Sequence, residues 1–106
     1  MVVRGEVWLV ALDPTVGSEI QKTRPCVVVS PPEIHDHVRT AIVAPMTTGN
    51  QPAPYRVSVV FDGKNGLILA DQIRAVDKIR LVKRLGAIDP KTLLAMLAVL
   101  QETFTE

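Results

Sequence analysis

The chain has 106 residues, which is enough for one domain with one hydrophobic core and too few for two domains. Apolar residues make up 47% of it and aromatic residues only 4%, so aliphatic side chains must fill the core. The net charge of +1 excludes a chain-wide basic field, so affinity for phosphate must come from a local cluster of cations. A single cysteine, Cys26, excludes an internal disulfide and a multi-cysteine zinc site.

The N-terminus shows no signal-peptide pattern, and no apolar run reaches the length of about 20 residues that crosses a membrane. We therefore expect a single cytoplasmic domain over residues 1–106 that makes no contact with a membrane. The apolar runs are short and separated by Pro, Gly, Asn and Asp, a pattern typical of β-strands. Strands are predicted at Glu6–Leu12, Pro25–Ser30, Ala41–Ala44, Val57–Phe61, Leu67–Ala70 and Val82–Ile88, with a helical turn around Asp77–Arg80.

The continuous apolar run from Pro25 to Ser30 favours a strand buried on both faces, with an unreactive Cys26 inside it. The segment from Asp62 to Gly66 carries two turn signals, Asp-Gly and Asn-Gly. Two long polar segments, Pro14–Thr23 and Thr48–Pro54, interrupt the strands. Loops of this length in a small domain are usually functional or mobile, so a ligand site is expected there.

The C-terminal segment has a helical pattern instead. Asp89 is a good N-cap, and Pro90 suits the first helical position because its missing N–H costs nothing there. Apolar residues then recur at a spacing of three and four, at Leu93, Met96, Leu97, Leu100 and Phe104. Many short strands and one terminal helix predict a mainly β fold, a strongly bent antiparallel sheet or barrel with the helix packed on it.

Six motifs stand in a fixed order along the chain: Arg4-Gly5-Glu6-Val7-Trp8, Leu12-Asp13-Pro14-Thr15, Gly17-Ser18-Glu19, Thr23-Arg24-Pro25, Ala44-Pro45-Met46-Thr47-Thr48 and Asp71-Gln72-Ile73-Arg74-Ala75-Val76-Asp77. In this order and spacing they resemble the MazF/PemK/Kid family of toxins from type II toxin–antitoxin systems. The resemblance implies an SH3-like barrel of the MazF/Kid/CcdB type, a homodimer, and metal-independent, sequence-specific cleavage of single-stranded mRNA without a cofactor, which inhibits translation. It also implies an antitoxin whose flexible segment covers the RNA-binding surface, and binding of operator DNA by the toxin–antitoxin complex through the antitoxin.

Metal-free RNA cleavage uses the ribose 2′-hydroxyl as nucleophile and leaves a 2′,3′-cyclic phosphate, so DNA would resist it. The resemblance assigns catalytic roles to Arg24 and Thr47. The guanidinium of Arg24 stays charged and can hold two phosphate oxygens, whereas a threonine hydroxyl is a poor base and is expected to hydrogen-bond to the phosphate. From the residues alone, Arg24 could instead form a salt bridge to Glu19 or Glu6, and Thr47 could satisfy a neighbouring backbone group.

The resemblance extends RNA binding to five further residues: Ser18, Glu19, Thr48, Asp71 and Gln72. Ser18 stands where some relatives have an acid–base histidine, which leaves the general acid and base unassigned. Glu19 could act as the base if burial raised its pKa, or it could be a solvated loop carboxylate. Leu69 replaces an arginine of some relatives, so their catalytic Arg–Asp pair is expected to be absent, with Asp71 and Gln72 positioning bases or the loop backbone.

Other polar residues have simpler interpretations. The segment His35-Asp36-His37 resembles a metal site in spacing, but no further His or Cys completes a tetrahedral set, which favours a solvated turn. Arg74 is expected to hold the barrel together through a carboxylate, and Trp8 to lie in the core or in a dimer seam. The densest basic cluster, which could collect phosphates or form a solvated face, is Lys78, Arg80, Lys83 and Arg84.

Two rival functions share the expected fold. One is a non-enzymatic poison of DNA gyrase like CcdB, which uses a tryptophan in its C-terminal tail, whereas the only tryptophan of this chain is Trp8. The other is a small β-barrel binding module without activity, in which Arg24 and Thr47 are structural. Cleavage of RNA, or its absence, separates the three.

Overall fold

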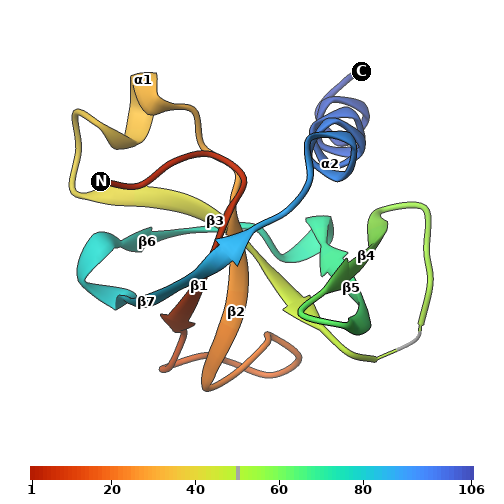
Figure 1. Cartoon of the computed structure of the whole chain (residues 1–106), viewed down its shortest axis with the longest axis horizontal. Helices are drawn as coiled ribbons and strands as arrows, with labels where there is room; N and C mark the ends of the chain where they lie inside the picture. Colours follow the sequence, from red (N-terminus) through yellow and green to blue (C-terminus); the bar gives the residue numbers. More distant parts are fainter. Residues whose placement is uncertain (50) are drawn as a thin grey trace.

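The computed structural model describes residues 1–49 and 51–106 (Figure 1). Its elements are β1 (Glu6–Ala11), β2 (Thr23–Val28), α1 (Pro32–His35), β3 (Thr40–Thr47), β4 (Arg56–Phe61), β5 (Lys64–Leu69), the 3₁₀ turn η1 (Ala70–Gln72), β6 (Arg74–Asp77), the 3₁₀ turn η2 (Lys78–Arg80), β7 (Leu81–Ala87) and α2 (Pro90–Thr103). All six predicted strands, the helical turn and the C-terminal helix are confirmed. The short strand β6 was not predicted, because its polar sequence has no strand pattern of its own.

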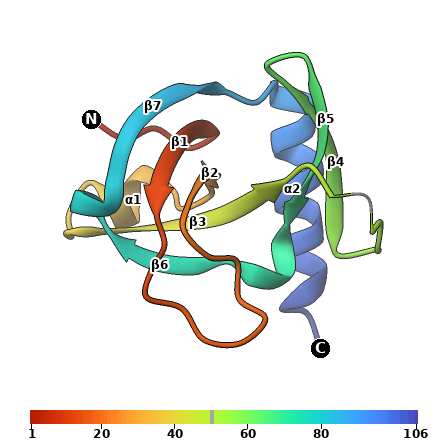
Figure 2. The same cartoon turned by 90° about the horizontal axis from the view of Figure 1, so that it is seen from below.

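The strands form one antiparallel sheet in the order β4-β5-β3-β2-β1-β7, and β6 pairs with β3 beside this path. The long strand β3 serves three neighbours, because its first half pairs with β6, its middle with β2 and its last two residues with β5. In Figure 2 the sheet curls around one side of the molecule, while α2 lies beside β4 and β5. The predicted mainly β fold with a C-terminal helix is therefore confirmed as a curled half-barrel.

Side chains of β2 and β3 alternate between two buried clusters, as the two-residue period of a strand requires. Val27 and Ala44 belong to the cluster beneath α2, which also holds Met96, whereas Cys26 and Val43 belong to the cluster on the other face. The prediction that β2 is buried on both faces is thus confirmed. Burial raises the pKa of the Cys26 thiol to about 12, so the residue is an inert part of the core.

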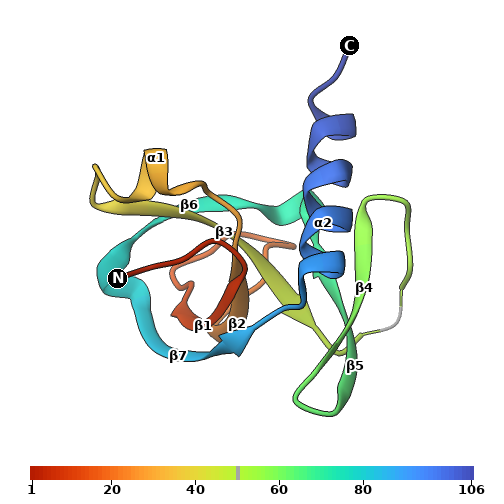
Figure 3. The same cartoon turned by 45° about the horizontal axis from the view of Figure 1, so that its top comes forward.

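The helix α2 begins as its sequence predicts. Asp89 Oδ1 accepts the backbone N–H of Thr92 at 2.7 Å, and this hydrogen bond holds the pKa of the Asp89 carboxyl below its usual range. Met96 is fully buried, but Leu94 and Phe104 are 68% and 74% exposed, so the apolar side of the helix is only partly covered by this chain. Figure 3 shows α2 standing beside the β4–β5 hairpin, with the C-terminus at its far end.

The interpretation of His35 as part of a solvated turn is wrong. The residue ends α1 and is fully buried, and its Nδ1 lies 2.9 Å from the hydroxyl of Ser30. Ser30 in turn accepts the backbone N–H of Ile42 from β3, so the imidazole helps to fasten α1 to the sheet. His37 is exposed, as expected. Within residues 1–49 and 51–106 no group of three His, Cys, Asp or Glu side chains gathers as a metal site would require.

None of the helices formed by the described residues is long and apolar enough to span a membrane.

Candidate active site

The predicted site residues lie in two pockets that adjoin the C-terminal end of β3. The Arg24 pocket, about 210 Å³ in volume, is lined by Arg24, Pro25, Met46, Thr47, Thr48, Val59, Phe61, Asp62, Lys64, Asn65, Gly66 and Leu85. The loop pocket, about 380 Å³, is lined by Leu12, Ser18, Glu19, Ile20, Pro45, Asp71, Gln72, Ile73 and Arg74. Strand β3 therefore contributes Pro45 to the loop pocket, and Met46 and Thr47 to the Arg24 pocket.

Arg24 and Thr47 line the same pocket, just beyond the last pair of the β2–β3 ladder. That pair is Cys26 and Pro45, and the two strands run on from it to Arg24 and to Thr47. The side chain of Arg24 is exposed, and its Nε donates a hydrogen bond to the backbone oxygen of Gln21 at 3.2 Å. The terminal nitrogens of the guanidinium have no partner among the described residues, so they remain available to an anionic ligand.

The alternative salt bridges of Arg24 do not form within the described part of the chain. Glu6 is held by Arg84, whose Nε lies 2.5 Å from its Oε2. Glu19 Oε1 instead accepts the backbone N–H of Val16 at 2.7 Å. The structural interpretation of Arg24 as one half of a surface ion pair is therefore wrong.

The hydroxyl of Thr47 is oriented by its own loop. Its Oγ1 accepts the backbone N–H of Gly49 at 3.1 Å, which leaves the O–H free to donate. The next strand approaches very closely here, since a Cβ at Gly66 would lie 2.6 Å from the backbone oxygen of Thr47. Gly66 thus allows β5 to pack against the end of β3 and brings Lys64 and Asn65 into the Arg24 pocket.

The β4–β5 hairpin that carries Lys64 turns where one of the two turn signals predicts. Asp62 and Gly63 have φ values of 52° and 74°, and Phe61 pairs with Lys64 across them. The second signal was wrong, because Asn65 and Gly66 lie within β5. The glycine there serves the close approach of two backbones instead of a turn.

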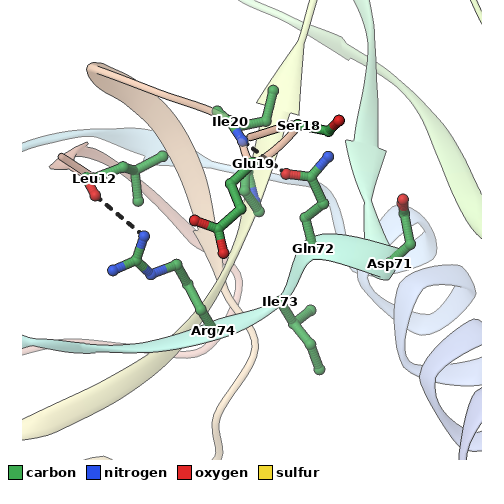
Figure 4. Close-up of a pocket in the computed structure, with 9 residues that line it drawn as sticks. Leu12, Ser18, Glu19, Ile20, Asp71, Gln72, Ile73 and Arg74 are labelled. Carbon is green, nitrogen blue, oxygen red and sulfur yellow. Dashed lines mark hydrogen bonds between the residues drawn. The ribbon is translucent and has the colours of Figure 1, made fainter. Parts of the chain in front are cut away.

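In the loop pocket the predicted residues hold the β1–β2 loop in place. Figure 4 shows the amide of Gln72 facing the backbone of Ile20, whose N–H donates to Gln72 Oε1 at 2.8 Å. The same figure shows Arg74 reaching the backbone oxygen of Leu12, at 3.1 Å. Arg74 thus has the predicted structural role, but its partner is a carbonyl oxygen instead of the predicted carboxylate. Glu19 is exposed on the loop.

Asp71 has an arginine partner that the sequence did not reveal. Arg56, at the start of β4, lies opposite Leu69 in β5, and its Nη2 is 3.5 Å from Asp71 Oδ2. The guanidinium also donates to the backbone oxygen of Gln51 at 3.2 Å. An Arg–Asp pair is therefore present at this edge of the sheet, although the arginine comes from the neighbouring strand. Only the strand pairing could have identified it, because Arg56 lies outside all six motifs.

Most side chains of the basic cluster predicted around η2 and β7 bind other groups of this chain. Lys78 donates to the backbone oxygen of His35, and Arg80 to that of Ala11 at 3.0 Å. Burial alone would raise the pKa of the Glu6 carboxyl, but Arg84, with the N–H groups of Val3 and Trp8, holds it below its usual range. Lys83 is exposed. Lys78, Arg80 and Arg84 therefore bind groups of the barrel itself.

This fold and site define a small β half-barrel with a C-terminal helix and a pocket lined by an arginine and a threonine from two neighbouring strands. The chain matches the model of the family described as PemK-like, MazF-like toxin of type II toxin–antitoxin system over residues 3–104. It therefore belongs to that family, and the resemblance found in its motifs is confirmed. As its relatives' names indicate, it is an endoribonuclease.

The comparisons with individual proteins agree with this assignment. The chain is 40% identical to the endoribonuclease PemK of Escherichia coli over 97 residues, which cover 86% of this chain and 72% of PemK. The crystal structure of MazF from Deinococcus radiodurans superposes with a TM-score of 0.85, at 23% identity and covering 96% of this chain and 94% of MazF. A mycobacterial endoribonuclease in complex with its cognate antitoxin superposes with a TM-score of 0.81, at 22% identity. The match covers 96% of this chain and 93% of the mycobacterial chain.

Proposed function

We propose that this endoribonuclease toxin cleaves single-stranded mRNA at specific sequences, without a metal ion, and thereby inhibits translation. In the reaction the ribose 2′-oxygen forms a bond to the adjacent phosphorus as the bond to the 5′-oxygen of the next nucleotide breaks. The 2′-hydroxyl loses its proton and the leaving oxygen gains one, so the products are a 2′,3′-cyclic phosphate and a 5′-hydroxyl. The observation that carries the proposal is the exposed Arg24 in the same pocket as Thr47.

Arg24 and Thr47 stabilise the charge that develops on the phosphorus oxygens. The terminal N–H groups of Arg24 bind two of these oxygens at once, and the charge of the guanidinium offsets the extra negative charge of the phosphorane. Thr47 donates its O–H to a phosphate oxygen while Gly49 fixes the hydroxyl from the other side. A donor that is already oriented does not need to reorganise during the reaction, which is why such groups have large effects on rate.

The RNA strand extends from the Arg24 pocket to its neighbours. Thr48 binds it beside the catalytic threonine. Ser18, Glu19, Asp71 and Gln72 bind the strand from the loop pocket, where they combine hydroxyl, amide and carboxylate groups without an aromatic ring. Recognition in that pocket therefore relies on hydrogen bonds to bases and riboses more than on stacking.

The proposed partners follow from the family and from the exposed surface. The toxin forms a homodimer, for which exposed aliphatic side chains offer apolar surface, among them Val60, Ile79, Val82 and Leu94. A cognate antitoxin neutralises it by covering the RNA-binding surface with a flexible segment, and the complex binds operator DNA through the antitoxin. Support comes from the family description and from the antitoxin complex of the mycobacterial endoribonuclease. The toxin acts in the cytoplasm, where mRNA is exposed.

The gyrase-poison alternative is not favoured. The matching family is that of the PemK-like and MazF-like toxins, and it covers residues 3–104.

The test is incubation of the purified protein with a long single-stranded RNA in the presence of a chelator. Discrete cuts that end in a cyclic phosphate are expected, and an Arg24→Ala variant should lose them. Arg39→Ala is the matched control, because Arg39 is an exposed arginine that lines neither pocket. Intact RNA with the unsubstituted protein would contradict the proposed reaction. Cutting that survives in the Arg24→Ala variant would leave the enzyme in place but show that the site is elsewhere.

A further inference from the structure

The Arg24 pocket does not end at Thr48. It continues into a third pocket of about 660 Å³, here called the Asn65 pocket, which lies between the β3–β4 loop, the β4–β5 hairpin and the start of α2. The two pockets share four lining residues, Thr48, Val59, Asn65 and Gly66. They therefore form one groove, and Asn65 stands at the junction between its two halves.

The two halves of this groove differ in charge. The Arg24 pocket contains two cationic side chains, Arg24 and Lys64, beside the carboxylate of Asp62, and the two cations suit a phosphate group. The Asn65 pocket has no lysine or arginine among its described lining residues, and its one charged residue is the carboxylate of Asp89. A phosphate would be repelled there, whereas hydroxyl and amide groups beside aliphatic surface are what a single-stranded nucleobase requires.

Asn65 is placed to contact that base. It lies in β5 opposite Val60, its side chain is exposed, and its amide has no hydrogen-bond partner among the described residues. The close packing of Gly66 against the backbone of Thr47 keeps Asn65 next to the proposed catalytic strand end. A side-chain amide both donates and accepts, so it can bind two atoms of one base edge at once.

We propose that Asn65 reads the base of the nucleotide next to the scissile phosphate, and that Asp89 favours a base with an exocyclic amino group. The inference rests on the proposed function, since it takes the Arg24 pocket as the phosphate site. Asp89 Oδ1 caps α2 through Thr92, and further hydrogen bonds from the Thr92 side chain and the Lys91 backbone help to lower the pKa of the carboxyl. Each carboxylate oxygen has two lone pairs, so Asp89 can accept one more hydrogen bond from the amino group. Adenine, cytosine and guanine carry such a group and uracil does not, so uracil is the base that this pocket disfavours.

The experiment maps the cut sites and relative rates on a random-sequence single-stranded RNA pool. The unsubstituted protein should prefer amino-bearing bases at one position beside the cut. Asn65→Ala should reduce the preference at that position about 10-fold and leave the other positions unchanged. Asn65→Asp, whose carboxylate only accepts, should strengthen the preference against uracil. Gln101→Ala is the matched control, because Gln101 is an exposed amide on α2 outside both halves of the groove.

Asp89→Asn tests the second half of the inference. Asparagine is as good an N-cap as aspartate, so α2 should keep its stability while the pocket loses its charge, and uracil should become more acceptable beside the cut. A uniform loss of rate with an unchanged cut-site profile in the Asn65 variants would overturn the role of Asn65. An unchanged profile in Asp89→Asn would overturn that of Asp89. Absence of any cleavage by the unsubstituted protein would overturn the proposed function itself and, with it, this inference.

Discussion

The Arg24 pocket and the loop pocket both contain polar residues, but the chain uses them differently. In the loop pocket the side chains of Gln72 and Arg74 bind backbone groups of the β1–β2 loop, and Asp71 pairs with Arg56. In the Arg24 pocket, Arg24 makes one hydrogen bond through Nε, and Thr47 accepts one from Gly49. The side chains of the loop pocket thus mainly hold the structure of the site, while Arg24 and Thr47 in the Arg24 pocket keep N–H and O–H donors for a ligand.

This difference shows that a polar motif does not by itself distinguish a binding residue from a supporting one. Both sets follow apolar strands, and both were expected to contact RNA. A side chain whose hydrogen-bonding capacity is already used can contribute to function by positioning the backbone, whereas one with unused donors can bind the substrate directly. Substitutions in the two pockets should therefore separate effects on rate from effects on stability.

The largest effect is expected from Arg24→Ala. Removing one preorganised charge-stabilising group should reduce kcat by about 10²–10³-fold, with almost no change in the free energy of unfolding, because Arg24 is exposed. Single-turnover cleavage and thermal unfolding measure the two quantities. Arg74→Ala should do the opposite and lower stability by about 1 kcal/mol, since it removes a partner of the buried Leu12 backbone. A stability loss in the Arg24 variant equal to that of Arg74→Ala would contradict the comparison.

Thr47→Val should reduce kcat by roughly 10-fold or more, since hydrogen bonds to charged groups contribute about 1.5–3 kcal/mol. Thr47→Ser keeps the hydroxyl and should retain most of the activity. The same single-turnover assay measures both variants. Loss of activity in Thr47→Ser with activity kept in Thr47→Val would mean that the methyl group, and not the hydroxyl, matters at this position.

The carboxylate of Glu6 should make the free energy of unfolding depend on pH. Its pKa is lower in the folded chain than the ordinary value of 4.5, so its contribution to stability is complete above that value and is lost as the pH falls through the folded pKa. Urea unfolding at a series of pH values should show this loss in the unsubstituted protein, while Glu6→Gln should have a flatter profile in the same range. At neutral pH, Glu6→Ala should cost about 1–3 kcal/mol, because it leaves the partly buried N–H groups of Val3 and Trp8 without their acceptor. Identical acid profiles for the unsubstituted protein and Glu6→Gln would exclude this role.

The smallest effect is expected from Gln72→Leu. Loss of the hydrogen bond to Ile20 should release the β1–β2 loop at a cost of about 1 kcal/mol. We expect KM for RNA to rise several-fold with little change in kcat, because the loop contributes binding groups and not the groups that act on the phosphorus. Gln72→Glu keeps an accepting oxygen and serves as the control. A fall in kcat without a change in KM would place Gln72 at the reacting phosphate instead.

Much of the fold could be predicted because its signals are local. The strand pattern around Cys26 and the cap-and-proline start of α2 each depend on a few neighbouring residues, and both are present as predicted. The motif order also identified the family, and with it Arg24 and Thr47 as the pair to examine. The sequence did not predict the environment of single residues. His35, for example, is buried although Glu33, Asp36 and His37 beside it are exposed.

The sequence by itself determined the class of fold, the terminal helix and the family, because periodicity, capping and motif order are properties of short segments. Only the tertiary structure decided which side chains meet. The pairing of β3 with three strands separates two pockets, the register of β4 and β5 brings Arg56 to Asp71, and the contact at Gly66 places Asn65 beside Thr47. Turns set the register of a hairpin such as β4–β5, but the choice of partners for a strand such as β3 depends on residues far apart in the chain, which no local pattern encodes.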